Sequence, residues 1–328
     1  MKIEWVRNET LVAVVIVAFC TLAALSDPGF LSIATLTDLL RGGIVLGIFA
    51  VGALIVLISG GIDVSFTAIG AFTMYVTAMV LNAALPWMPW WAALMIGMSV
   101  GASLGAINGF LIAVMGLPTL IVTLGTLSIF RGFMLTFIGQ KQITTLPPGM
   151  REFGRMMVLR GENADGSFYS LHAAFLVTAL AIVLTWFILH RTMLGRQIFA
   201  IGGSVESARR IGINVRAVQF FVYVYVGALA GLTGIIHASM ARVANPFDLV
   251  GLELSVIAAV VLGGARLAGG HGTLTGSLLG VALIVLVRNS LIVLGIPATW
   301  QSVAIGVLIL IGTGLPAWQA KRAAARAA

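Results

Sequence analysis

The chain has 328 residues, of which 60% are hydrophobic and only 9% are charged, and its formal net charge is +8. Soluble domains average about 25% charged residues, so this composition excludes an ordinary soluble protein and predicts a polytopic membrane protein. No nucleic-acid partner is expected, because no basic run exceeds two residues and no aromatic side chains alternate with the basic ones.

Apolar runs of the length that crosses a bilayer, about 20 residues, follow one another along the chain. The first run lacks a small-residue cleavage site followed by a soluble domain, so we expect it to remain as a span. Residues 30–41 are only half apolar and predict a short helix that lies at the outer surface or dips into it. The predicted spans cover residues 11–25, 42–59, 64–81, 91–115, 119–138, 171–189, 217–240, 252–264, 274–294 and 299–315.

The expected fold is therefore an all-α polytopic membrane protein, with one transmembrane domain over residues 1–328. It has about ten transmembrane helices, and some are short or broken at Gly-rich turns. Ten spans place both termini on the same side as the loops 190–216 and 265–273. These segments hold eleven Lys and Arg residues, against six on the other side. Because Lys and Arg are retained in the cytoplasm, the bias predicts cytoplasmic termini and makes 139–170 an external loop.

The segment 190–216 holds five Lys or Arg residues and one acid, Glu206. Gly202 and Gly203 end the preceding structure. The Ser204 hydroxyl can then cap a new helix, and a carboxylate in the first turn suits the positive end of the helix dipole.

Gly212 can close this short helix in the left-handed conformation. About two helical turns are unstable alone in water, so the apolar face must rest on this protein or on a partner. That face consists of Val205, Ala208 and Ile211. From the residues alone, an ordinary cytoplasmic loop and a docking element both remain open.

Motifs for bond chemistry are missing from the sequence. No Lys follows a Gly, which excludes a Walker A loop, and neither an HExxH nor a GxSxG motif occurs. The four histidines are scattered and Cys20 is the only cysteine, so neither a metal site nor an intramolecular disulfide is expected. We therefore expect no catalytic residue and no cofactor in this chain.

Polar residues within the spans are functional candidates, because an ionisable group in the bilayer costs roughly 2.5–3.5 kcal/mol. Asp63 follows a Gly-Gly break and either caps the third span or lines a path. Arg131 either snorkels to the outer headgroups or serves the path, and Asn108 either joins helices or lines the path. Glu253 opens the eighth segment, where capping explains it as well as function does. The predicted path-lining residues are Asp63, Asn108, Thr123, Thr126 and Arg131.

A weak internal repeat is present. The stretch 57–61 ends in Gly-Gly and is similar to 261–264, which also ends in Gly-Gly. Each stretch is followed by an apolar residue and a glycine, at 69–70 and at 279–280. Gly-interrupted apolar segments in corresponding positions of two halves can mark a transporter's binding site. Chance similarity remains the alternative explanation.

Four stretches carry a resemblance to a known family. They read SGGIDVSFTAIGAF at 59–72, LPTLIVTLGTLSIFRG at 117–132, GRQIFAIGGSVESARRIGINV at 195–215 and GLELSVIAAVVLGGARLAGGHGTLTGSLLG at 251–280. In this order and at these separations they resemble the permease subunits of bacterial ABC importers for ribose and similar simple sugars. The finer match is to members that carry rhamnose-like sugars or autoinducer-2. The chain departs from the usual family pattern at 64–67 and at 204–207.

The resemblance implies an inner-membrane transport subunit that moves a simple sugar by alternating access. A short helix of 190–216 would enter a groove on a separate ATPase subunit, which holds the ATP and Mg. The other implied partners are a periplasmic sugar-binding protein and a second permease subunit, identical or different. The resemblance assigns the coupling role to Gly202, Gly203, Glu206, Ala208, Arg210 and Gly212.

Two rival classes make different demands on the sequence. A stand-alone secondary transporter or facilitator of a small polar solute would need coupling charges at mid-membrane, and few are present. An intramembrane enzyme would need a cluster of His or carboxylate residues within the spans, which the sequence lacks.

Overall fold

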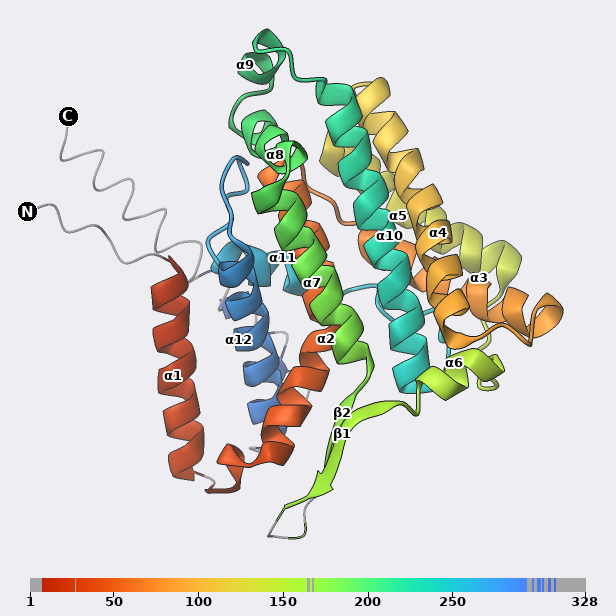
Figure 1. The fold of residues 1–328 in the computed structure, drawn as a ribbon, viewed down its shortest axis with the longest axis vertical. Coiled ribbons are helices and arrows are strands. Elements are labelled where there is room, and N and C mark those ends of the chain that lie inside the picture. The colour runs from red at the N-terminus through yellow and green to blue at the C-terminus, as the bar shows by residue number, and fades with distance from the viewer. Residues whose placement is uncertain are drawn as a thin grey trace, which may run out of the picture.

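The computed structural model describes residues 8–26, 28–163, 166, 168–293, 297, 300–301, 303, 306–307 and 310. Long helices form a bundle around α2 and α10, and a small hairpin projects from one end (Figure 1). The elements are α1 (Asn8–Ser26), η1 (Pro28–Leu31), α2 (Ile33–Ile58), α3 (Phe66–Ala84), α4 (Trp90–Gly109), η2 (Phe110–Val114), α5 (Thr119–Phe133), η3 (Met134–Ile138), α6 (Pro148–Phe153), β1 (Met157–Glu162), β2 (Phe168–His172), α7 (Ala174–Arg191), α8 (Met193–Gly203), α9 (Val205–Arg210), α10 (Val215–Ala241), α11 (Glu253–Leu262) and α12 (Leu274–Val293).

Six described helices are long and apolar enough to cross a membrane: α2, α3, α4 with η2, α5 with η3, α7 and α10. Shorter apolar helices occupy 9–25, 253–262 and 274–290. The predicted tenth span at 299–315 lies mostly outside the described residues. The structure thus supports a polytopic helical membrane protein, and the count of ten spans stays a prediction.

The prediction of separate elements at 30–41 and 42–59 is wrong, because the single helix α2 runs from Ile33 to Ile58 across the expected boundary. Ser32 starts this helix, since its hydroxyl accepts a hydrogen bond from the Thr35 N–H at 3.2 Å. Gly42 does not break it. A Cβ on Gly42 would lie 3.0 Å from the Val285 side chain, so this glycine permits close packing of α2 against α12.

The predicted external segment 139–170 holds more than an irregular loop. It contains α6 and an antiparallel hairpin, in which Arg160 pairs with Ser170 and Glu162 with Phe168. The following span begins at Ala174 instead of 171, because β2 runs to His172. The His172 imidazole Nδ1 accepts the Ala174 N–H at 2.9 Å and so satisfies a donor at the start of α7.

Helices α4 and α10 meet through glycines, which form a seam of backbone against backbone. A Cβ on Gly101 would lie 2.2 Å from the Gly227 carbonyl oxygen, and one on Gly231 would lie 2.1 Å from that of Gly97. Small residues at such faces let spans approach closely in lipid. We call Gly97, Gly101, Gly105, Gly227 and Gly231 the glycine seam.

Replacing Gly101 by Val should lower the free energy of unfolding by about 3 kcal/mol, since overpacking typically costs 1–3 kcal/mol and here the clash is with main chain. The measurement is the thermal unfolding midpoint in detergent. Gly125→Val is the matched control, because a Cβ on this α5 glycine meets nothing within 4 Å. Equal midpoints for the two variants would contradict the seam.

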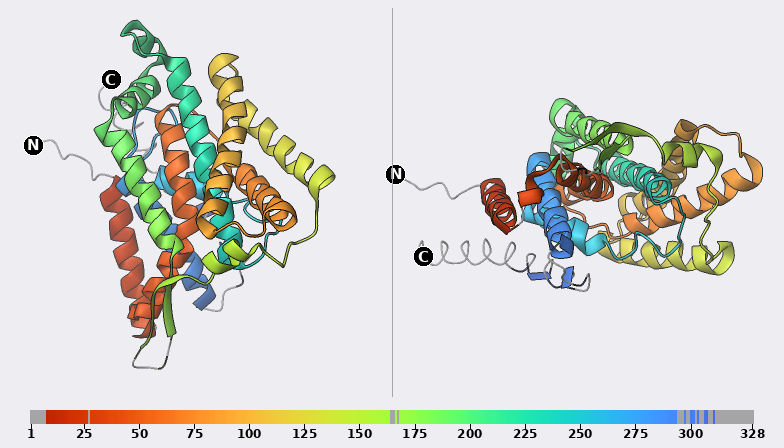
Figure 2. Two further views of the ribbon diagram at one scale, coloured as in Figure 1. Left: turned by 45° about the vertical axis from the view of Figure 1, so that its right-hand side comes forward. Right: turned by 90° about the horizontal axis from the view of Figure 1, so that it is seen from below.

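The bundle has two distinct ends. Helices α8 and α9 lie at one end and the β1–β2 hairpin at the other, in both side views (Figures 1 and 2). The loop 263–273 shares the α8 end, because the Gly270 N–H donates to the Ile58 carbonyl, and α8 also abuts this carbonyl, through Gly202. The first turn of α1 reaches this loop as well, since the Thr273 hydroxyl at the end of the loop donates to the Glu9 carboxylate. The segments 190–216 and 265–273 are predicted to lie on the same side of the membrane, and this arrangement agrees with that prediction.

The echo between 57–61 and 261–264 extends to backbone geometry. Helices α2 and α11 both end in a Schellman motif, with Gly60 at φ +85° and Gly264 at φ +98°. The Gly61 N–H donates to the Val56 carbonyl at 3.0 Å, and the Ala265 N–H donates to that of Val260 at 3.2 Å. The same stop signal therefore closes a helix in each half of the chain.

Candidate coupling surface and substrate path

The predicted short helix exists as α9, with the predicted caps. The Ser204 hydroxyl accepts the Ser207 N–H at 3.2 Å. Gly212 has φ +85°, and the Ile213 N–H closes the helix on the Ala208 carbonyl at 3.1 Å. Helix α9 stands at the outermost edge of its end of the bundle (Figure 1).

The apolar residues of α9 and of its C-cap, Ile211, differ in exposure. Ala208 is only 1% exposed and rests on this chain, whereas Ile211 is 74% and Val205 38% exposed. Of the two supports left open by the sequence, Ala208 therefore rests on this protein, and Val205 and Ile211 remain available to a partner. The exposed surface also carries an ion pair at 2.5 Å between Glu206 and Arg210. A large side chain at Ala208 would displace α9 from its own protein before it met a partner.

Gly202 ties this segment to the interior of the bundle. A Cβ there would lie 1.7 Å from the Ile58 carbonyl oxygen and 2.5 Å from the Gly270 nitrogen. A Cβ on Gly269 would lie 2.6 Å from the Gly60 Cα. We call Gly60, Gly202, Gly269 and Gly270 the four-glycine contact. It joins the end of α8 to the end of α2 and to the loop 263–273.

The segment 59–65 between α2 and α3 is non-helical and largely buried. Asp63 accepts hydrogen bonds from the backbone N–H and the hydroxyl of Ser65, both at 2.7 Å. The Asn108 amide of α4 donates to the same Ser65 hydroxyl at 2.7 Å. Asp63 therefore caps the start of α3, and Asn108 fixes the cap in place. Buried irregular backbone in a membrane protein has to be satisfied in this way.

Helix α5 holds the same segment from another side. The Ile62 N–H donates to the Thr119 hydroxyl at 3.1 Å, and the Thr123 hydroxyl donates to the Ile62 carbonyl at 3.2 Å. Thr126 lies one turn further and donates to the Thr123 carbonyl at 3.4 Å. The predicted path residues Asp63, Asn108, Thr123 and Thr126 therefore gather around 62–65.

Arg131 stands apart from this cluster, two turns further along α5. Its side chain is half-buried, and no hydrogen bond or ion pair holds it among the described residues. The prediction that it serves the path stays open.

Glu253 joins the two halves of the chain. Its carboxylate accepts the Gly251 N–H at 2.9 Å and a hydrogen bond from the Thr67 hydroxyl of α3. The start of α11 is thereby bound to the first turn of α3, beside the Asp63 cap. Capping at Glu253 was an expectation, but Thr67 carried no sequence signal because its partner lies in the other half of the chain.

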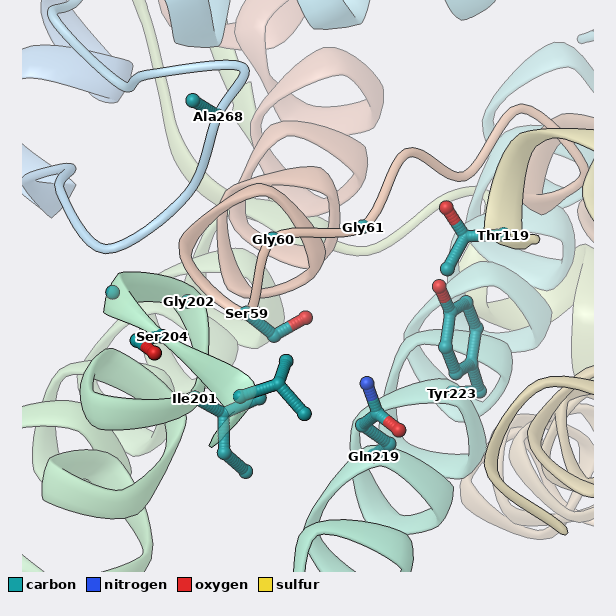
Figure 3. Close-up of a pocket in the computed structure, with 12 residues that line it drawn as sticks. Ser59, Gly60, Gly61, Thr119, Ile201, Gly202, Ser204, Gln219, Tyr223 and Ala268 are labelled. Atoms are coloured by element: carbon teal, nitrogen blue, oxygen red, sulfur yellow. The ribbon is translucent and has the colours of Figure 1, made fainter. Parts of the chain in front are cut away.

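An inner cavity of about 240 Å³ lies at the α8 end, between the segment 59–61 and the α8–α9 junction (Figure 3). Sequence reasoning missed its polar groups, because Gln219 and Tyr223 sit singly in a long apolar run. The cavity is lined by Ser59, Gly60, Gly61, Thr119, Ile201, Gly202, Gly203, Ser204, Val205, Gln219, Tyr223 and Ala268.

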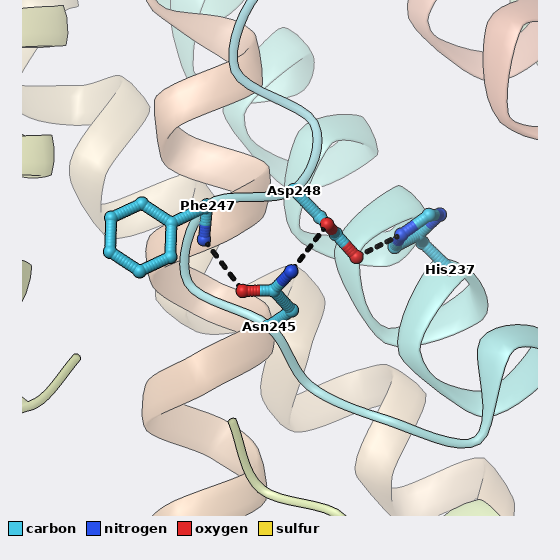
Figure 4. Close-up of polar contacts among 4 residues, drawn as sticks. All are labelled: His237, Asn245, Phe247 and Asp248. Atoms are coloured by element: carbon cyan, nitrogen blue, oxygen red, sulfur yellow. Dashed lines mark hydrogen bonds and ion pairs between the residues drawn. The ribbon is translucent and has the colours of Figure 1, made fainter. Parts of the chain in front are cut away.

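An outer cavity of about 600 Å³ lies toward the hairpin end, between the first turns of α2 and the last turns of α10. Unlike the inner cavity it carries charged side chains, Asp38 and Arg41, and also His237. His237 in turn bonds Asp248 at 3.1 Å, and Asn245 donates to the other Asp248 oxygen at 2.8 Å (Figure 4). This network fixes the loop that leads from α10 to α11.

Residues 35–312 match the family model described as "Branched-chain amino acid transport system / permease component". The chain belongs to this permease family. The Autoinducer 2 import system permease protein LsrC of Salmonella typhi is 33% identical to it over 306 residues, which are 93% of this chain and 84% of the relative. The proteins of that name from Escherichia coli (strain K12 / DH10B) and Shigella flexneri are 31% identical over 306 residues. No solved structure matches the chain.

The predicted kinship with importer permeases is confirmed by these comparisons. The family description speaks of branched-chain amino acids, whereas the relatives are named for autoinducer 2. Membership in the permease family therefore leaves the substrate to be argued from the site.

Proposed function

We propose that this permease imports a small polyhydroxylated molecule, a simple sugar or a furanosyl compound such as autoinducer-2, by alternating access. The observation that carries the proposal is the physical continuity from α9 to the interior. The exposed α9 surface leads to Gly202, which touches the Ile58 carbonyl at the end of α2. The segment 59–65 follows at once and holds Asp63, the cap that Asn108 fixes. A displacement of α9 would thus be transmitted to the buried non-helical segment 59–65 between α2 and α3.

The energy enters from a separate ATP-binding subunit. Its docking surface on this chain is the exposed part of α9, namely Val205, Ile211 and the charges Glu206, Arg209 and Arg210. ATP and Mg bind to that subunit, and this chain holds no cofactor. A periplasmic binding protein delivers the substrate at the hairpin end, and a second permease subunit completes the pathway.

Both termini and α9 face the cytoplasm in this proposal, which rests on the bias of basic residues. Single cysteines at Arg209 and Val158, in a Cys20→Ala background, test it. Both positions are exposed, at opposite ends of the bundle. An impermeant thiol reagent should label position 158 but not 209 in intact spheroplasts, and both after lysis. The reverse pattern would invert the topology.

A sugar is favoured over an amino acid as the substrate, because none of the described residues that line the inner cavity is charged. A zwitterionic amino acid would need charged partners along its way, since burying an unpaired charge is costly. One observation favours an amino acid, namely the pair Asp38 and Arg41 in the outer cavity.

Uptake of labelled ribose, rhamnose, autoinducer-2 and leucine separates these substrates. The permease should be co-expressed with the ATP-binding and substrate-binding subunits encoded in the same genome. ATP-dependent uptake of one of the first three compounds is expected. Uptake of leucine alone would replace the sugar by an amino acid. Uptake by the permease without an ATP-binding subunit would make it a secondary transporter.

A further inference from the structure

The inner cavity has the features of a ligand site. The Tyr223 hydroxyl is buried, with the residue only 2% exposed, and its one side-chain partner among the described residues is the Thr119 hydroxyl, in a contact too irregular to satisfy it fully. An incompletely paired buried hydroxyl is costly, so a ligand with hydroxyl groups could complete its hydrogen bonding. It points toward Thr119 at the edge of the cavity (Figure 3).

Further hydrogen-bonding groups surround the same space, and none of them is ionised. The Thr119 hydroxyl accepts the Ile62 N–H at 3.1 Å and shares its remaining hydrogen-bonding capacity with the Tyr223 hydroxyl beside it. The Ser59 hydroxyl donates to the Val56 carbonyl at 2.7 Å and keeps lone pairs to accept. The half-buried Gln219 amide supplies both donors and an acceptor. Donors and acceptors on several sides, beside an aromatic ring, suit a molecule that carries hydroxyl groups over a carbon ring.

The size of the cavity and the lack of charge in its described lining limit which molecules can bind there. A cavity of about 240 Å³ has the volume of about eight water molecules in the liquid, below the range of drug-sized sites. A monosaccharide fits this scale. A sugar phosphate would need a cation, and the described lining contains none.

We propose that the inner cavity is a binding site for a neutral, monosaccharide-sized polyol, and that Gln219, Tyr223, Ser59 and Thr119 hold it by hydrogen bonds. The inference rests on the proposed function and adds a substrate site at the α8 end of the path. A molecule there touches Gly60 and Gly61 on one side and Ile201–Val205 on the other. It therefore contacts both parts that the four-glycine contact joins.

Direct binding to the purified permease in nanodiscs tests the site. The probes are D-ribose, L-rhamnose and autoinducer-2, with ribose 5-phosphate as the anionic counterpart, followed by saturation-transfer NMR. At least one neutral probe should bind, and ribose 5-phosphate should not. Tyr223→Phe and Gln219→Leu should each weaken binding about threefold to tenfold, the usual worth of one or two hydrogen bonds.

The matched control is Tyr225→Phe. Tyr225 lies on the same helix, but its hydroxyl pairs with Thr185 at 2.7 Å and lines no part of the cavity. This variant should bind like the parent protein. Three results would each overturn the proposal: equal binding by Tyr223→Phe and Tyr225→Phe, binding of ribose 5-phosphate, or no binding of any neutral probe. The last result would mean that the cavity holds only water.

Thiol protection locates the ligand without any transport assay. A cysteine at Gly203 lines the inner cavity, and one at Ala241 lines the outer cavity, both in a Cys20→Ala background. The bound sugar should slow labelling at position 203. Protection at 241 alone would place the sugar in the outer cavity and overturn the inference. If the sugar protects position 203 but uptake does not require ATP, the proposed import mechanism is wrong and the binding site is still supported.

Discussion

Replacing Gly202 by Ala should cut substrate-stimulated ATP hydrolysis and uptake by about tenfold or more. The added Cβ would lie 1.7 Å from the Ile58 carbonyl oxygen, so the end of α8 has to move away from the end of α2. Overpacking of this kind typically costs 1–3 kcal/mol, and each 1.4 kcal/mol is tenfold in an equilibrium. The measurement is hydrolysis and uptake in proteoliposomes that hold the complete importer.

Gly43→Ala is the control for this variant, because a Cβ on this glycine of α2 meets nothing within 4 Å. It should match the parent protein in hydrolysis and uptake, and it should be slightly more stable, since Ala is favoured over Gly within a helix by roughly 0.5–1 kcal/mol. If both variants transport normally, the four-glycine contact does not transmit the motion of α9.

Replacing Ile211 by Asp should release the ATP-binding subunit and abolish uptake while the permease itself stays folded. Ile211 is 74% exposed, so the substitution removes no internal packing, whereas a carboxylate in a docked apolar contact would be buried without a partner. Truncating or charging a central contact of an interface commonly costs 2 kcal/mol or more, which is about thirtyfold in affinity. Co-purification of the two subunits measures the loss.

Val158→Asp puts the same charge on an exposed apolar residue of β1, at the opposite end of the bundle. It should leave the ATP-binding subunit attached. Release by both variants would point to a general loss of the fold, and retention by Ile211→Asp would remove α9 as the docking surface.

The parts of the molecule that could be predicted are those written in neighbouring residues. Ser204 and Gly212 mark the ends of α9 because a cap hydroxyl and a left-handed glycine act within one turn. Asp63 as the cap of α3 has the same local origin. The spans follow from apolar length, although the half-apolar composition of 30–41 suggested an element separate from 42–59, whereas α2 runs through Gly42 without a break. A glycine in a helix reads alike in sequence whether it ends the helix or admits a neighbour.

What could not be predicted depends on residues that are distant in sequence. Ala208 turns inward because the fold places α9 on its own chain, and no spacing within α9 reveals this. The hydrogen bond of Thr67 to Glu253 and the contact of Gly202 with Ile58 join segments from separate parts of the chain. The inner cavity forms only where the non-helical segment 59–65, α5, α8 and α10 come together. Gln219 and Tyr223 therefore could not be recognised from the sequence as neighbours of a cavity.

The glycine seam has a mechanical consequence. Side chains that interdigitate can be repacked in a second register, but α4 and α10 touch through main-chain atoms, and sliding would drive carbonyl oxygens into Cα positions. We expect the pair to move as one stiff body through the transport cycle. The hinge then falls where the backbone is not helical, at 59–65. Spin labels at Met95 and Ile107 on α4, each paired with one on Phe220 of α10, should keep their separations when ATP binds, and a change in either would show that the body bends.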